Sequence, residues 1–262
     1  FVEKVWNRSE QIAKKNYTVI VHGKPTHEET RATFSHASAN TPTIIVNDMN
    51  DTITLGKYIS GEKDKALFGE DFKGKYSAGF DINDHLQRIG VVNQTTMLAS
   101  DTQEISDYLK QVMAKTYKLD DSNIEERFAD TRDTLCYATN DNQSAVYGLL
   151  EKQADMAIVV GGYNSSNTTH LVELCEPKLS TYFINNEEKI LSGNAILHYD
   201  IHSKTEKLTE DFLSADKPVT ILMTSGASCP DALVEGVINK LKTIFAIDKP
   251  ADELLQSLDV YQ

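Results

Sequence analysis

Two histidines and two carboxylates follow a run of β-branched residues near the start of the chain, in the segment VIVHGKPTHEET at 19–30. His27 and Glu29 are the pair best suited to chemistry, because they lie two residues apart in a turn after an apolar run. Glu29 could act as a general acid or base, and His27 could move a proton, donate to an anion or bind a metal. The alternative is a solvated loop, since titratable side chains are mostly exposed.

Three further polar loops also follow apolar runs: NQTTM at 93–97, GGYNSSNTT at 161–169 and TSGASCPD at 224–231. In open α/β sheets, ligands bind at the carboxyl ends of strands, where the following helices present free N–H groups. Hydroxyl and amide side chains at helix starts suit phosphate oxygens, and the candidates are Ser165, Ser166, Asn167 and Ser228.

The same side chains have a simpler interpretation as helix caps. Serine and asparagine are ordinary N-cap residues, and Ser228 with Asp231 has capping-box spacing. A cap needs only one residue, however, whereas each of these loops offers several. No loop is a Walker A or a dinucleotide-binding fingerprint. The pattern therefore favours an anion site of another kind.

The three cysteines are widely spaced and odd in number, which is unlike a disulfide framework and favours a reducing compartment. Cys136 follows a polar turn and leads into a helix, a setting that favours a thiolate able to bind metal or attack an electrophile. Cys175 is interpreted as buried and inert, and Cys229 is left open. The other histidines lack metal-ligand spacing and are interpreted as framework or surface residues: His22, His36, His85, His170, His198 and His202.

Composition excludes some classes of function. The 262 residues include 39 acidic and 26 basic side chains, for a formal net charge of -13, and no basic block could follow a phosphate backbone. Nucleic acid is therefore not expected as a partner. No apolar stretch reaches the roughly 20 residues that span a bilayer, and no signal peptide is visible. The chain opens on Phe1 inside an amphipathic pattern, so we expect a fragment.

Hydrophobic periodicity predicts strands alternating with helices. The expected strands lie at 17–21, 43–46, 89–92, 156–160 and 219–223. Helices are expected over 2–16, from 49 to about 61, after a capping box of Asp101 and Glu104, over 145–150, and after 231. The glycine-containing, charged segment 62–87 is interpreted as a surface excursion.

This alternation predicts an α/β fold of two similar domains, each a small mostly parallel sheet flanked by helices. The predicted domains are 1–132 and 133–246, with a boundary near Arg132 and a C-terminal tail over 247–262.

Five segments, in this order, resemble the LytB/IspH family of 4-hydroxy-3-methylbut-2-enyl diphosphate reductases: HGKPTHEET, NQTTM, DTLCYATNDNQ, VVGGYNSSNTTHL and TSGASCPD. The resemblance covers essentially the whole chain and is strongest to the plant and cyanobacterial branch. It implies reduction of the allylic alcohol diphosphate to isopentenyl and dimethylallyl diphosphate, the last step of the methylerythritol phosphate route to isoprenoids. Ferredoxin or flavodoxin would supply the electrons, in the bacterial cytoplasm or the plastid stroma.

The resemblance also implies a 4Fe-4S cluster held by three cysteines, of which Cys136 matches one. Family members carry the other two in an α/β domain that would precede Phe1, so the chain is expected to supply two domains of a three-domain, pseudo-threefold enzyme. Alone, it is expected to be inactive.

Individual roles follow from the same resemblance. Glu29 matches a proton-delivering glutamate, Thr95 its hydroxyl partner at the substrate alcohol, and His27 a histidine near the substrate and its diphosphate. Ser165, Asn167 and Ser228 match diphosphate contacts, while the roles of Ser166, Thr139 and Gln94 are less defined. Two rival hypotheses are a metal-assisted phosphoester hydrolase built on His27 and Glu29, and a diphosphate-binding fragment without activity.

Overall fold

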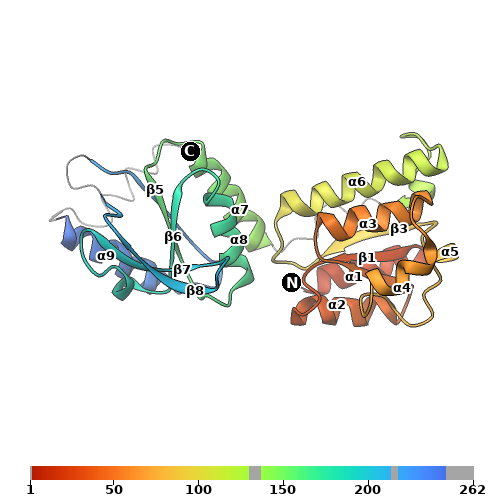
Figure 1. Cartoon of the computed structure of the whole chain (residues 1–262), viewed down its shortest axis with the longest axis horizontal. Helices are drawn as coiled ribbons and strands as arrows, with labels where there is room; N and C mark the ends of the chain where they lie inside the picture. The colour runs from red at the N-terminus through yellow and green to blue at the C-terminus, as the bar shows by residue number, and fades with distance from the viewer. Residues whose placement is uncertain (1, 130–136, 214–217, 246–262) are drawn as a thin grey trace. The chain divides into compact units, whose positions relative to one another are not determined.

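The computed structural model of the chain describes residues 2–129, 137–213 and 218–245 (Figure 1). The chain divides into two compact units, Phe1–Asn140 and Asp141–Gln262. The predicted boundary near Arg132 and the predicted tail lie outside the described residues, so the domain limits stay a prediction.

The first unit is built on a four-stranded parallel sheet with strand order β2-β1-β3-β4. Helices α1 and α2 cover one face through Val5, Ile12 and Ala37, and helices α3 and α6 cover the other through Leu55 and Leu109 (Figure 1). Burial on both faces explains why the strands are continuously apolar. The elements are β1 (Thr18–His22), β2 (Thr43–Val46), β3 (Ile89–Asn93), β4 (Phe128–Ala129), α1 (Val2–Lys14), α2 (Glu28–Ser38), α3 (Met49–Ser60) and α6 (Ala99–Tyr117).

The interpretation of 62–87 as a surface excursion is wrong for its aromatic residues. This segment forms α4 (Phe68–Asp71) and α5 (Ile82–His85), and it contributes Phe68 and Phe72 to the core of the first unit. Phe68 also contacts the rings of Tyr76 and Phe80. The aromatic residues recur every four positions among charged ones, and burial of their large rings outweighs the polar composition of the segment.

The capping box predicted at Asp101 is also wrong. Helix α6 begins at Ala99 after Leu98, so Asp101 lies inside its first turn. Leu98 is itself buried, and its packing starts the helix earlier than the polar pattern indicates. The carboxylate of Asp101 still has a favourable position near the positive end of the helix.

The second unit has a three-stranded parallel sheet with order β6-β5-β9. Val146 of α7 and Leu171 of α8 pack on one face, and Val237 of α9 packs on the other. A separate antiparallel hairpin, β7–β8, was not predicted from the sequence. The elements are α7 (Tyr137–Leu150), β5 (Met156–Val160), α8 (Ser166–Cys175), β6 (Ser180–Ile184), β7 (Ala195–Asp200), β8 (Thr205–Glu210), β9 (Ile221–Ser225) and α9 (Asp231–Ile244). The predicted α/β class, with parallel sheets flanked by helices, is confirmed.

Candidate functional site

The loops after β1 and β3 begin side by side in the first unit. Their parallel register places His22 opposite Asn93, and the backbone N–H of Gln94 donates to the His22 carbonyl at 2.8 Å. Both loops therefore leave the same edge of the sheet, where parallel α/β sheets bind ligands.

His27, Glu29 and Thr95, the three predicted catalytic residues, form one cluster at this edge. His27 is the N-cap of α2, and its Nδ1 accepts from the Glu29 N–H at 3.3 Å. The carboxylate of Glu29 accepts from the backbone N–H of Thr95 at 2.5 Å. The role predicted for the Thr95 hydroxyl, at the substrate alcohol, stays a prediction; the structure adds a contact of Glu29 with the Thr95 backbone.

The hydrogen bond at His27 also determines which ring nitrogen can reach a ligand. Because Nδ1 accepts, the proton of the neutral imidazole lies on Nε2. His27 and Glu29 are half-buried, so both remain partly accessible to solvent. The cluster thus combines a carboxylate, a hydroxyl and a ring N–H donor at the positive end of α2.

Gln94 connects the backbone segments that carry this cluster. Its side chain is fully buried; Oε1 accepts from the Thr30 hydroxyl at 2.8 Å and from the Lys24 N–H at 3.3 Å. Nε2 donates to the Thr96 hydroxyl at 2.6 Å. A Cβ on Gly23 would lie 2.5 Å from the Thr30 hydroxyl, so only glycine fits beside this contact. The family resemblance had left the role of Gln94 undefined.

The second unit places Ser165 and Asn167 at the start of α8. Ser165 is the N-cap, and its hydroxyl accepts from the Thr168 N–H at 3.3 Å, so its interpretation as a cap is correct. Asn167 is 6 % exposed, and neither its amide nitrogen nor its amide oxygen has a partner among the described residues. Leaving a buried polar group unpaired costs about 1–3 kcal/mol, so this amide requires an explanation. Ser166 is half-buried, and Thr139 is buried in α7.

The loop after β9 approaches the same helix start. The Gly226 N–H donates to the Val160 carbonyl at 3.1 Å, and a Cβ on Gly226 would collide with the Thr168 hydroxyl. A turn closed by the Cys229 N–H and the Gly226 carbonyl exposes Ser228. Helix α9 starts after Pro230 without a side-chain cap, so the capping-box interpretation of Ser228 is wrong. Its hydroxyl makes no hydrogen bond within the part of the chain that the structure describes.

The described cysteines are unsuited to hold a metal cluster. Cys136 lies outside the described residues, directly before α7. Cys175 is buried in the core, as predicted, and burial raises the pKa of its thiol to about 11. Burial likewise raises the pKa of Cys229, whereas cluster ligands are thiolates. No three histidine, cysteine or carboxylate residues gather as a ligand set within 2–129, 137–213 and 218–245. The described residues therefore do not fit an iron–sulfur cluster.

The remaining histidines have structural surroundings. His22 is buried, and its Nδ1 contacts the Thr102 hydroxyl at 2.9 Å, while His36 stacks on Trp6. Among the described helices, none combines the length and apolarity needed to cross a membrane.

Comparison with known proteins gives a consistent result. The family model described as LytB protein matches residues 1–242. Proteins named 4-hydroxy-3-methylbut-2-enyl diphosphate reductase are 41 % identical in Picosynechococcus sp. and 40 % identical in Trichodesmium erythraeum, each over 92 % of this chain and 58 % of the relative. The chain thus spans less than two thirds of these relatives. The solved reductase structure from Plasmodium falciparum has a TM-score of 0.57 at 23 % identity, over 92 % of this chain and 57 % of that one, which supports the fold alone.

Proposed function

The chain belongs to the LytB protein family, and from that premise we propose that it forms part of a 4-hydroxy-3-methylbut-2-enyl diphosphate reductase. The reaction adds two electrons and two protons to the allylic alcohol diphosphate, breaks its C–O bond, and releases water with isopentenyl or dimethylallyl diphosphate. Within this reaction we assign diphosphate binding to the second unit and proton supply to the first.

The observation that carries the proposal is the buried amide of Asn167, which has no hydrogen-bond partner within 2–129, 137–213 and 218–245. Its nitrogen can donate to a phosphate oxygen, and the N–H groups at the start of α8 favour negative charge. Ser165 and Ser228 add hydroxyl groups from the two loops that meet there. A diphosphate would therefore pair the amide nitrogen without requiring a cluster of basic side chains.

The cluster of His27, Glu29 and Thr95 supports the assignment of proton supply. We infer that the Thr95 hydroxyl holds the substrate alcohol, that Glu29 delivers a proton to the departing oxygen, and that Nε2 of His27 donates to the substrate. The N–H of Thr95 fixes the Glu29 carboxylate in place at 2.5 Å. A carboxylate held this way can return to the same position after each proton transfer.

The electron-transfer part of the proposal rests on the family resemblance. We propose a 4Fe-4S cluster with Cys136 as one ligand, reduced by ferredoxin or flavodoxin, in the bacterial cytoplasm or the plastid stroma. The described residues form no site for that cluster, so the steps assigned to this chain are binding, orientation and proton supply.

The decisive experiment substitutes Glu29. The full-length product of the gene is expressed and loaded anaerobically with iron and sulfide. It should then reduce the hydroxylated diphosphate with ferredoxin or dithionite as donor. Glu29→Gln should abolish turnover while inorganic diphosphate affinity changes little, because proton delivery is lost and anchoring is not. Glu28→Gln is the matched control, since Glu28 is the exposed neighbour.

Four outcomes would contradict the proposal or one of its assignments. A brown, fully cluster-loaded protein that gives no turnover would exclude the reductase. Hydrolysis of a phosphoester by a colourless protein with zinc or magnesium would favour the rival hydrolase. Diphosphate binding without turnover in any loaded form would leave only the binding fragment. Equal loss of affinity and rate in Glu29→Gln would make Glu29 a binding residue.

A further inference from the structure

Tyr163 lies inside the loop that leads to the proposed diphosphate site. It is the second residue of a turn that the Ser165 N–H closes on the Gly162 carbonyl at 2.9 Å. Ser165 then caps α8, and Asn167 is the second residue of that helix. The position of the Tyr163 backbone therefore affects where Ser165 and Asn167, the proposed diphosphate contacts, lie.

The side chain of Tyr163 is fixed by the β7–β8 hairpin. Its ring stacks on Tyr199 of β7, with centroids 4.5 Å apart and planes 13° apart, and meets the edge of Phe183 at 5.1 Å. Its hydroxyl donates to Glu206 of β8 at 2.9 Å. Tyr199 and Glu206 face each other in the hairpin register, so Tyr163 contacts both strands at one position. Burial raises the pKa of Tyr163, which keeps the hydroxyl protonated as a donor.

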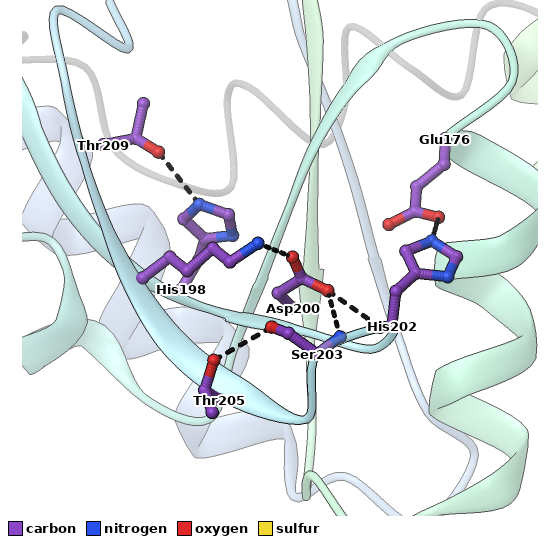
Figure 2. A network of polar contacts seen from close by, with 8 residues as sticks. Glu176, His198, Asp200, His202, Ser203, Thr205 and Thr209 are labelled. Carbon is purple, nitrogen blue, oxygen red and sulfur yellow. Dashed lines mark hydrogen bonds and ion pairs between the residues drawn. The ribbon is translucent and has the colours of Figure 1, made fainter.

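The β7–β8 hairpin is itself held by polar contacts in its loop and along its strands (Figure 2). Asp200 accepts from the N–H groups of His202 and Ser203 and pairs with Lys207. The carboxylate of Glu206 also pairs with Lys189 at 2.5 Å. Strand β8 is largely exposed, so these polar contacts, rather than burial, order the hairpin.

The hairpin also reaches the other end of α8. Figure 2 shows His202 of the hairpin turn beside Glu176, the C-cap residue of α8. The His202 Nε2 lies 2.9 Å from the Glu176 carboxylate. The same hairpin therefore contacts the chain just before α8 through Tyr163 and just after it through Glu176. Two attachments at opposite ends restrict sliding and tilting of the helix better than one.

We propose that Tyr163 is a positioning residue and that the β7–β8 hairpin braces α8, so that Ser165 and Asn167 are held ready for the diphosphate before it binds. This inference rests on the proposed function, because the ligand of the braced loop is the diphosphate. A preformed site needs less ordering on binding, which improves affinity.

The test measures loop order and ligand binding separately in the 262-residue chain. Tyr163→Phe removes the hydroxyl and keeps the ring, while Glu206→Ala removes the acceptor from the other side. Tyr182→Phe is the matched control, because Tyr182 also packs on the hairpin at His198 but its hydroxyl has no hydrogen bond among the described residues. Hydrogen exchange followed by mass spectrometry reports on the amides of 161–168, and calorimetry with inorganic diphosphate reports affinity.

Both variants should speed exchange in 161–168 and weaken diphosphate binding roughly threefold to tenfold, the range of one lost hydrogen bond. The effect of the double variant should be smaller than the sum of the two single effects, because both substitutions remove the Tyr163–Glu206 hydrogen bond, and Glu206→Ala also removes the ion pair to Lys189. Tyr182→Phe should change neither measurement. Unchanged exchange in both variants would overturn the brace, whether or not diphosphate binds. Faster exchange with wild-type affinity would overturn its link to the ligand, whereas failure of the unsubstituted chain to bind diphosphate would count against the proposed function instead.

Discussion

At the residue scale, the proposed site contains two buried side-chain amides that differ in how many hydrogen bonds they make. Gln94 uses both ends of its side chain to join three backbone segments, whereas Asn167 uses neither end among the described residues. A paired buried amide stabilises the fold, and an unpaired one reduces stability until a ligand pairs it. The two residues should therefore respond differently to substitution.

Gln94→Ala should lower the free energy of unfolding by about 2 kcal/mol or more, because it leaves the Thr30 hydroxyl and the Lys24 N–H without their acceptor. Urea unfolding measures this change. Gln87→Ala is the control, since Gln87 is exposed and should change stability by no more than about 0.5 kcal/mol. Equal effects of the two substitutions would show that Gln94 does not hold the loops together.

Asn167→Leu should have the opposite effect on stability. Leucine has the same branching and the same number of side-chain heavy atoms, and it removes two polar atoms that have no partner among the described residues. The free energy of unfolding should therefore rise by about 1 kcal/mol while diphosphate affinity falls about tenfold. Thermal unfolding and calorimetry provide the two measurements. Loss of stability in Asn167→Leu would mean that the amide is already paired in the free protein.

The sequence could predict which residues gather at this scale, but not how they pair. His27, Glu29 and Thr95 were predicted together and lie together. That Glu29 contacts the Thr95 N–H, and that Ser228 caps no helix, depends on the path of each loop to within an ångström. Residue order alone does not contain that information.

At the element scale, strands buried on both faces were the most predictable. The runs 43–46 and 156–160 coincide with β2 and β5 because parallel strands require continuous apolar sequence. The β7–β8 hairpin was missed because β8 is mostly exposed and polar. The residues that hold the hairpin in place, such as Glu176 and Tyr163, are distant from it in the sequence.

The link between the hairpin turn and α8 should depend on pH. The hydrogen bond to Glu176 raises the pKa of His202 above its usual 6.5, with smaller contributions from Asp200 and Glu173. A raised pKa stabilises the folded state below about pH 6.5, and that contribution is lost as the pH rises through the higher folded value. NMR titration should therefore place the His202 pKa above 6.5. Glu176→Gln should lower it clearly, and Glu173→Gln should lower it less. A titration unchanged by Glu176→Gln would contradict the contact.

At the scale of the whole molecule, the formal net charge of -13 opposes the approach of a diphosphate, and the proposed contacts are mostly neutral amides and hydroxyls. Repulsion acts over a Debye length, which shrinks from about 30 Å at 0.01 M salt to about 8 Å at 0.15 M. Diphosphate affinity should therefore hold steady or rise modestly across this range, because screening removes long-range repulsion more than short-range hydrogen bonds. Calorimetry at several sodium chloride concentrations measures the trend. A steep fall in affinity would instead indicate binding by a cluster of lysines or arginines and would move the site away from Asn167.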